Sequence, residues 1–243
     1  MIRLFHASDL HFGAEDRAAL DWFAACVERE RPDAIIITGD VTMRARAREF
    51  AAAAAWLAAL PAPVTVEIGN HDMPYFNPYE RAFHPYRRFG AMAGAVEAPL
   101  GLPGLCVVPL RTTSRAQWRW NWSKGVVRPR CRDAAAAQVA AAVAAENLVL
   151  VAAHHPLVET GTRGTAWTKG GNAALDALIG AGAHAILSGH VHDPFDQMHH
   201  SPAGSIRMIG AGTLSERVRH SPPGFNAITH ANGALQVVAR TMG

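Results

Sequence analysis

Five short apolar runs in this chain each end in a polar cluster, and this pattern limits the folds that the chain can adopt. In a parallel β-sheet the strands are buried on both faces and read as near-continuous runs of Val, Ile and Leu. Ligands of such sheets bind just beyond the carboxyl ends of the strands. The runs therefore predict strands whose polar clusters converge at one edge. They cover residues 2–7, 34–38, 64–68, 148–153 and 183–188.

The clusters consist of side chains that bind metals, and their types restrict the metal. They are Asp9-Leu10-His11, Gly39-Asp40, Gly69-Asn70-His71-Asp72, His154-His155-Pro156 and Gly189-His190-Val191-His192. Asp, Asn and His offer oxygen and imidazole nitrogen, and none of these clusters contains a Cys. Such a set suits Mn, Fe or Zn, and it holds too much nitrogen for a site built for Ca or Mg alone. The sequence therefore predicts a metal site.

The order of the clusters resembles the calcineurin-like metallophosphoesterases, whose motifs are D-x-H, GD, GNH(D/E), a His shortly before Pro, and GHxH. This chain has all five motifs in that order, over residues 9–192. Any single motif is weak, whereas the ordered set is specific. The resemblance implies an α/β fold, a four-layer αββα sandwich of two mixed β-sheets flanked by helices, formed as a single domain over residues 1–243.

The resemblance also implies which residues hold two metal ions, with Mn or Fe as the expected metals and Zn as an alternative. The implied ligands are Asp9, His11 and His192 for one metal, Asn70, His154 and His190 for the other, and Asp40 as the bridge between them. A shared carboxylate offsets the repulsion between two dications roughly 3.5–4 Å apart. At the adjacent pair of histidines, His154 is expected to be the ligand and His155 is the alternative.

His71 follows the ligand Asn70 directly, and the resemblance implies that it is catalytic. It would act as a general acid for the leaving alkoxide or as a charge stabiliser on the phosphoryl group. Asp40 is expected to be catalytic with it, because the metals that it bridges generate the hydroxide that attacks phosphorus in line. Asn70, His71 and His155 are expected to contact the substrate, with His155 at the pocket mouth. Asp72 either orients His71 or caps the next segment.

Differences between this chain and particular branches of the family predict its substrate class. The protein Ser/Thr phosphatases continue their GD motif with V-D-R-G, whereas this chain continues with Val41-Thr42-Met43-Arg44 and lacks the Asp-Arg pair. A DNA-capping domain and a helical insertion, typical of other members, are not evident. We therefore expect a phosphodiesterase for cyclic nucleotides or related small phosphodiesters. A phosphomonoesterase or broad-specificity phosphatase is the near alternative, and a metal-binding scaffold without turnover is the alternative from another class.

The remaining pattern predicts alternating helices and strands, followed by a tail rich in strands. Helices are expected near residues 15–30, 45–60, 133–145 and 172–180, with a short helical stretch within 74–91. Further strands are expected at 105–110, 206–209, 225–229 and 234–240. The last two are joined by Ala231-Asn232-Gly233, and Asn-Gly is a strong hairpin signal.

Composition agrees with a cytoplasmic enzyme. The net charge is +3, which gives little reason to expect a nucleic-acid partner. The three Cys residues have no pairing spacing and are expected to be reduced, and no signal peptide is expected before Asp9. The Ala-rich residues 134–153 fit a helix followed by a strand better than a membrane span. The expected partner is a small phosphoester, with a homodimer as a further possibility.

Two other features have open interpretations. The alternating Trp118, Trp120 and Trp122 would either cover the core or an interface, which we favour, or stack nucleobases. His199 and His200 are expected in the loop after the GHxH motif, with a surface role favoured over a role at the site mouth.

Overall fold

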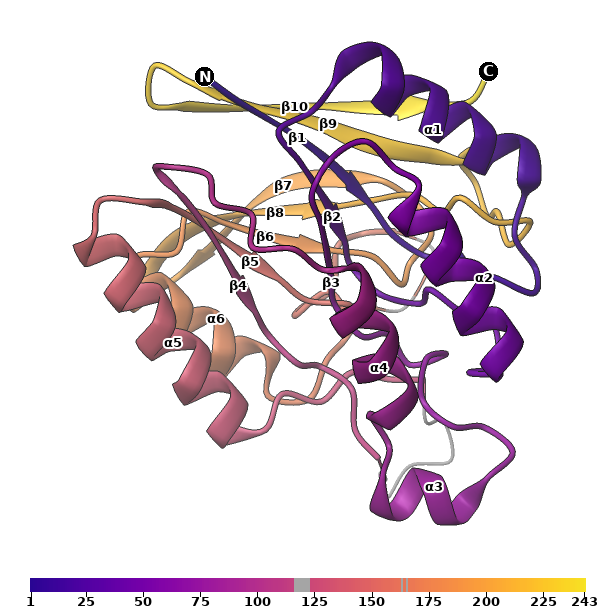
Figure 1. The fold of residues 1–243 in the computed structure, drawn as a ribbon. Helices are drawn as coiled ribbons and strands as arrows, with labels where there is room; N and C mark the ends of the chain where they lie inside the picture. The colour runs from indigo at the N-terminus through magenta and orange to yellow at the C-terminus, as the bar shows by residue number, and fades with distance from the viewer. Residues whose placement is uncertain (116–122, 163, 165) are drawn as a thin grey trace.

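Two five-stranded sheets lie face to face in the computed structural model, which describes residues 1–115, 123–162, 164 and 166–243 (Figure 1). The first sheet has the strand order β10-β9-β1-β2-β3, with β1, β2 and β3 parallel and β9 antiparallel to both of its neighbours. Its strands are β1 (Ile2–Ala7), β2 (Ala34–Ile37), β3 (Val64–Val66), β9 (Gly224–Ala231) and β10 (Ala234–Thr241).

The second sheet has the order β4-β5-β6-β8-β7, in which only β7 runs antiparallel to its neighbour. Both sheets are therefore mixed, and each contains a block of parallel strands whose carboxyl ends meet at one edge. The strands are β4 (Leu105–Pro109), β5 (Leu148–Ala152), β6 (Ala185–Ser188), β7 (Phe195–Ser201) and β8 (Gly204–Gly210).

Helices cover the outer faces of both sheets. Helices α1 and α2 pack on the first sheet, whereas α5 and α6 pack on the second (Figure 1). The helices are α1 (Arg17–Glu30), α2 (Ala47–Ala58), α3 (Pro78–Phe83), α4 (Arg87–Val96), α5 (Pro129–Ala144) and α6 (Gly171–Gly180). None of the helices in the described ranges combines the length and apolar character that crossing a bilayer requires.

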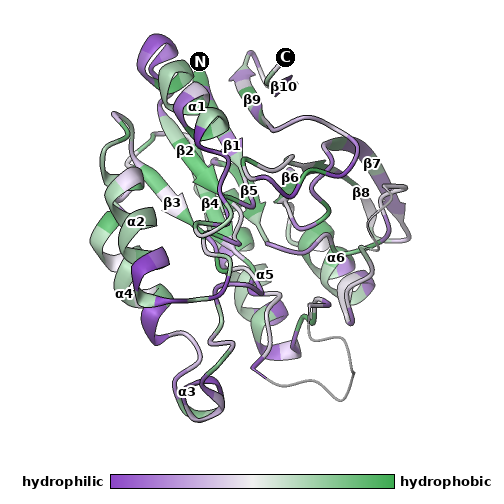
Figure 2. Cartoon of the chain, turned by 90° about the vertical axis from the view of Figure 1, so that its right-hand side faces the viewer, coloured by the Kyte–Doolittle hydropathy of each residue, from purple (hydrophilic) through white to green (hydrophobic). Residues whose placement is uncertain are grey.

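Strand alternation explains why the chain forms four layers. Successive side chains of a strand point to opposite faces, so Leu4 of β1 packs between the two sheets while Phe5 packs under the first helical layer. On β5, Leu150 likewise faces the other sheet while Val149 packs under α5 and α6. Figure 2 shows the resulting hydrophobic interior strands. The predicted four-layer sandwich of two mixed sheets is confirmed.

Most predicted elements are present, with shifted ends. The hairpin at Asn232 and Gly233 forms, and both residues have the positive φ that a two-residue turn of this kind needs (50° and 75°). The prediction that His199 and His200 lie in a loop is wrong, because both belong to β7. The stretch 74–91 was expected to hold one short helix, but it holds α3 and the start of α4. The three tryptophans of residues 118–122 lie outside the described residues.

Candidate metal centre

The predicted ligands come from the carboxyl ends of five strands. Asp9 and His11 follow β1, Asp40 follows β2, and Asn70 follows β3. The second sheet supplies the other three after β5 and β6. They are His154, His190 and His192. The structure thus brings all seven predicted ligands from both sheets to one edge, where groups of their ligand atoms lie within 4.8 Å of one another or in direct contact.

One group consists of Asp9, His11 and His192, all of which are buried. The Nε2 atom of His192 lies 3.1 Å from Asp9 Oδ1, and the Nε2 atom of His11 lies 3.6 Å from the same oxygen. The two Nε2 atoms are 3.4 Å apart. Three ligand atoms from two separate loops therefore face a common point.

The second group adjoins the first through Asp40. Its Oδ2 atom lies 3.3 Å from His154 Nε2 and 3.9 Å from His11 Nε2. The His154 Nε2 atom is also 3.2 Å from Asn70 Oδ1, and His154 forms a further group with His155 and His190. Asp40 Oδ2 therefore lies between the imidazoles of His154 and His11, which belong to different groups. A ligand shared by two metal ions would have to lie there.

The two adjacent histidines have different surroundings. His154 donates from Nδ1 to the Thr38 carbonyl at 2.8 Å, which leaves Nε2 directed at Asp40. His155 contacts the Thr112 hydroxyl through Nδ1 and the Ser123 carbonyl through Nε2, both at 2.8 Å. Both nitrogens of His155 thus have protein partners, and its side chain is buried rather than at a pocket mouth. This geometry favours His154 as the ligand, and a substrate contact by His155 stays a prediction.

Buried atoms without partners test whether the site fits metal ions. Asp9 Oδ1 and His11 Nδ1 are buried and accept or donate no hydrogen bond among the residues described. A buried polar atom without a partner costs free energy, typically about 1–3 kcal/mol. A cation beside the Asp9 carboxylate would remove that cost for the oxygen. Carboxylate, amide and imidazole donors are also the set that Mn, Fe and Zn accept, so the residues fit two such ions.

The ligands differ in protonation state. Burial alone would raise the pKa of Asp40, but the neighbouring imidazoles, His154 foremost, hold it well below its usual value. Asp9 has a lowered pKa in the same way, chiefly through His192, against the effect of burial. In return, and also against the effect of burial, Asp40 raises the pKa of His154 to about 9 and Asp9 raises that of His192. Burial lowers the pKa values of His11 and His190. Both carboxylates are therefore ionised and two imidazoles neutral, whereas metal binding would have to displace a proton from each of the other two.

The backbone at the strand ends adopts strained conformations. Nine described residues other than glycine have positive φ, and five of them are predicted ligands. Positive φ is unfavourable for residues with a Cβ atom. The five ligands are Asp9 (57°), His11 (47°), Asp40 (50°), His190 (69°) and His192 (61°). The sharp turns aim these side chains back across the ends of their strands.

Two glycines allow the loops to approach closely. A Cβ atom on Gly69 would lie 2.1 Å from the Asp40 nitrogen, and one on Gly189 would lie 1.8 Å from the Ser8 hydroxyl. Neither glycine has positive φ, so the close approach, and not a turn, requires them. The glycines of the GNH and GHxH motifs thus hold the loops in contact.

His71 is held by three contacts beside the ligands. Its backbone N–H donates to Asp40 Oδ1 at 2.8 Å, and its ring Nδ1 donates to the Met43 carbonyl at 2.7 Å. The other ring nitrogen, Nε2, lies 3.0 Å from Nη1 of Arg217. Because a carbonyl only accepts, the proton is on Nδ1 and Nε2 of the neutral ring accepts from Arg217.

Asp72, for which two roles were open, instead ties two loops together. Its carboxylate accepts hydrogen bonds from the backbone N–H groups of Val41, Thr42 and Gly69 and from the Thr42 hydroxyl. Burial, followed by the charge of Asp40, raises the pKa of Asp72 to about 7. Asp72 therefore fixes the loop after β2 against the loop after β3.

Arg217 is the functional candidate that sequence reasoning missed. It lies in a loop after β8, where its carbonyl accepts a hydrogen bond from Nδ1 of His192 at 2.6 Å. Its side chain contacts His71 and lines a cavity of ≈ 170 Å³ beside the ligands.

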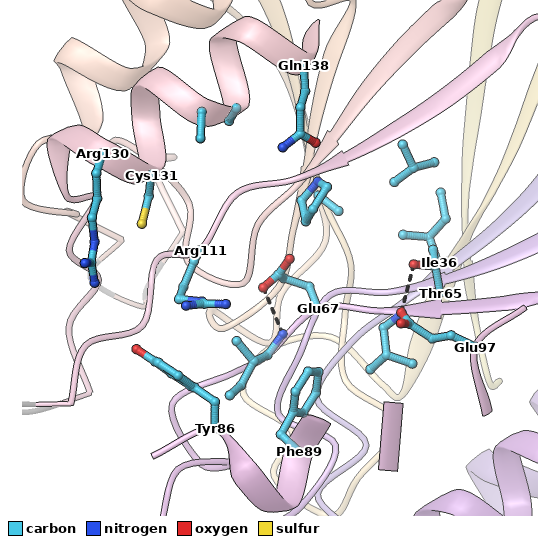
Figure 3. A pocket seen from close by; sticks show the side chains of 17 residues that line it. Ile36, Thr65, Glu67, Tyr86, Phe89, Glu97, Arg111, Arg130, Cys131 and Gln138 are labelled. Carbon is cyan, nitrogen blue, oxygen red and sulfur yellow. Dashed lines mark hydrogen bonds between the residues drawn. The ribbon is translucent and has the colours of Figure 1, made fainter. Parts of the chain in front are cut away.

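A larger cavity of ≈ 730 Å³ opens elsewhere, beside the unpaired edges of β3 and β4 and between α4 and α5. Figure 3 shows the carboxyl of Glu67 and the guanidinium of Arg111 directed into it. Glu67 is 8% exposed and accepts a hydrogen bond from the Ile68 N–H at 3.1 Å. None of the seven predicted ligands lines this cavity, so its size does not mark it as the reaction site.

Comparisons with known proteins agree with this geometry. The family profile described as Calcineurin-like phosphoesterase matches residues 2–194. No curated protein sequence matches the chain. Among solved structures, a dimetal phosphatase from Danio rerio has a TM-score of 0.72 at 13% identity, covering 99% of this chain and 96% of that one. The purple acid phosphatase PPD1 from yellow lupin seeds has a TM-score of 0.65 at 12% identity, and the match covers 99% of this chain but 51% of the lupin enzyme. At these identities the two likenesses show the fold.

Proposed function

We propose a specific chemistry for this chain from the premise that it belongs to the calcineurin-like phosphoesterase family and is a metal-dependent phosphoester hydrolase. In this proposal Asp9, His11 and His192 would hold one metal ion. Asn70, His154 and His190 would hold a second, and Asp40 would be shared by both. The observation that carries the proposal is the convergence of these ligand atoms from five strand ends, with Asp9 Oδ1 buried and without a hydrogen-bond partner.

Two cations at this position, with Mn or Fe expected, would act as Lewis acids toward the phosphoryl oxygens. They would also lower the pKa of the attacking water, so that hydroxide is available at neutral pH. The chain's own residues position the reactants. Asp40 holds the His71 backbone through Oδ1 while Oδ2 faces the imidazoles, so one carboxylate links the ligand cluster to the catalytic candidate. The Met43 carbonyl fixes the plane of the His71 ring.

His71 and Arg217 form the pair that would meet the developing charge. His71 is proposed to serve as a general acid for the leaving oxygen or to stabilise the phosphoryl group. Either role requires a proton on Nε2, which accepts from the Arg217 guanidinium in this structure, so His71 would act in its protonated form. Arg217 is already a donor, and both side chains line the cavity of ≈ 170 Å³. Donors fixed in advance toward developing negative charge are among the largest contributors to catalysis.

The finer form of the proposal is a phosphodiesterase for cyclic nucleotides or related small phosphodiesters. A phosphomonoesterase with the same site is the second candidate, because a cavity lined by Lys124, Arg217 and Arg219 also suits a dianionic phosphoryl group. A scaffold without turnover is disfavoured by the contact between His71 and Arg217, both of which line the cavity beside the ligands. A cytoplasmic location and a homodimer remain predictions.

The test is hydrolysis of bis-p-nitrophenyl phosphate and p-nitrophenyl phosphate by metal-stripped protein, with and without added Mn. Mn-dependent turnover that favours the diester would support the phosphodiesterase, and cyclic nucleotides would be assayed next. A preference for the monoester would replace it with the phosphomonoesterase. Protein that binds Mn but hydrolyses neither compound, nor any cyclic nucleotide, would contradict an enzymatic role.

A further inference from the structure

We propose that the cavity of ≈ 730 Å³ beside β3 and β4 is a second ligand site, which binds an aromatic organic anion that also carries an N–H donor. This is the chemistry of a nucleoside phosphate. The cavity is called the edge cavity below, and its lining includes Glu67, Arg111 and Arg130. None of the seven predicted metal ligands lines it, so the proposal does not depend on the proposed function.

The edge cavity has the size and the walls of a site for a small organic molecule. Its volume falls within the ~300–1,000 Å³ that is common for such sites, whereas the cavity at the candidate metal centre has ≈ 170 Å³. Interior side chains of both sheets form part of the wall, among them Ile36, Val107 and Ala152. The half-buried Tyr86 and Phe89 add aromatic surface, on which planar rings stack. A ligand can therefore bury an aromatic body here.

Glu67 is a buried acceptor that is directed into the edge cavity (Figure 3). Its Oε1 atom accepts a hydrogen bond from the Ile68 N–H at 3.1 Å. Among the residues that the structure describes, its Oε2 atom has no hydrogen-bond partner. A buried carboxyl oxygen without a partner costs free energy. An N–H donor on a ligand would remove that cost.

Arg111 supplies a positioned cation in the same cavity. Its Cζ atom lies over the Tyr86 ring, 4.3 Å from the ring centroid. This stacking covers one face of the guanidinium and leaves the N–H groups at its edge for an anion. The charge of Arg111 acts on Glu67, yet no ion pair joins the two groups. A ligand between them can accept from Arg111 and donate to Glu67 at the same time.

The first turn of α5 adds a second element that favours an anion. The helix follows the N-cap residue Arg128, has no side-chain cap and carries no acidic residue in its first turn. Arg130 and Cys131 of this turn line the edge cavity. Cations at a helix N-terminus oppose the helix dipole, whereas an anion there is stabilised by it. An anion in the cavity would thus meet the dipole and two guanidinium groups.

The remaining carboxylate of the edge cavity is already used. Glu97 Oε1 accepts from the Thr65 hydroxyl at 3.1 Å and from the Val66 N–H at 2.7 Å, so it closes the edge of β3. Glu67 is therefore the acceptor for a ligand donor, and the two arginines are the donors for a ligand anion. Phosphate alone would leave Glu67 without a donor, and a simple amine would leave the arginines without an anion. An aromatic anion with an amino group satisfies both.

Cys131 gives a readout that is local to the edge cavity. Its half-buried thiol lines the cavity, whereas the half-buried Cys106 does not. We would measure by mass spectrometry the rate at which iodoacetamide modifies each thiol of the Mn-loaded protein. The ligand is the phosphonate analogue of adenosine 5′-monophosphate, in which a methylene group replaces the ester oxygen and prevents hydrolysis. It should slow the modification of Cys131 and leave that of Cys106 unchanged.

Two related compounds test the parts of the ligand. Adenosine lacks the anion, and the same phosphonate of purine riboside lacks the amino group. Each should need a concentration roughly tenfold higher for half-protection of Cys131, since one charge-assisted hydrogen bond is worth about that factor.

Substitutions assign the binding to the arginines. Arg111→Met and Arg130→Met should each raise the half-protecting concentration of the adenosine phosphonate roughly tenfold, and that of adenosine much less. Both arginines are exposed, so their replacement leaves the core intact. Because Arg130 precedes Cys131, protection is expressed relative to the rate of the same variant without ligand. The matched control is Arg48→Met, an exposed arginine of α2, which should behave as the parent.

The outcomes decide this site independently of turnover. Protection of Cys131 that persists after a chelator removes Mn, and that the arginine substitutions weaken, would support the proposal. No protection, equal protection by either of the two related compounds, or protection that both substitutions leave unchanged would overturn it. Loss of protection together with the metal would also overturn it, because the ligand would then be bound at the candidate metal centre.

Discussion

Glu67 offers a test of the fold's electrostatics that does not involve the metal centre. Its carboxyl is 8% exposed, lies at the end of β3 and accepts a hydrogen bond from the Ile68 N–H. Burial raises the pKa of Glu67 to about 7 from an ordinary value of 4.5. The charge of Arg111, whose guanidinium points into the same cavity, opposes that rise (Figure 3). We predict that Glu67→Gln stabilises the protein above pH 7.

The sign follows from proton linkage. Because the pKa is higher in the folded state, the folded protein binds more protons than the unfolded chain between about pH 4.5 and 7. Stability therefore falls as pH rises through this window. A difference of about 2.5 pKa units corresponds to ~3.4 kcal/mol in full, of which ~2.5 kcal/mol is lost between pH 5 and 8. Glu67→Gln removes this loss, because a neutral amide keeps the acceptor for Ile68 and carries no charge.

Urea unfolding, followed by circular dichroism at pH 5, 6, 7 and 8 in the presence of a chelator, measures the effect. The free energy of unfolding of Glu67→Gln, relative to that of the parent, should rise by about 2.5 kcal/mol from pH 5 to 8. Other groups titrate equally in both proteins and cancel. Asp176→Asn, at an exposed carboxylate of α6, serves as the control. Parallel pH profiles for parent and Glu67→Gln, or an equal gain in the control, would refute the reasoning.

Three further substitutions test the centre itself. Asp40→Asn should lower bound metal, measured by mass spectrometry, together with turnover, and full activity would contradict the bridging role. His71→Ala should lower kcat by roughly 100-fold or more while metal content is retained; a parallel loss of metal would assign it a structural role instead. Gly189→Ala should destabilise the protein by several kcal/mol (~3) in thermal unfolding, because its Cβ would lie 1.8 Å from the Ser8 hydroxyl. Gly180→Ala meets nothing within 4 Å and should unfold as the parent does.

The sequence predicted the elements that position the site because parallel strands are buried on both faces. Runs such as residues 34–38 carry no polar residue before their final Thr, so apolar composition alone marks them. Strand β7 was missed because Phe195–Ser201 alternates between half-buried and exposed positions and contains mostly polar side chains. A strand at the edge of a sheet has one partner and little core to face, so its sequence lacks a clear apolar signal.

The site was predicted less evenly than the fold. Motif order predicted seven ligands, which the structure brings together, but the choice between His154 and His155 depends on which carbonyl each ring meets. Those carbonyls belong to Thr38 and Ser123, which are distant in sequence. Arg217 likewise reaches His71 across 146 residues of chain. Contacts of this kind arise from the packing of loops, and no spacing within one segment encodes them.

The strained backbone of the centre supports metal binding but does not by itself support turnover. A left-handed conformation costs an ordinary residue about 1–2 kcal/mol, and this chain accepts it at five predicted ligands. Glycine would relieve that strain but would remove the carboxylate or imidazole, so the conformation is explained by the direction that it gives to these side chains. The strain therefore argues for metal binding, which a scaffold would share. Turnover is supported instead by His71 and Arg217, which contact each other beside the ligands and line the same cavity.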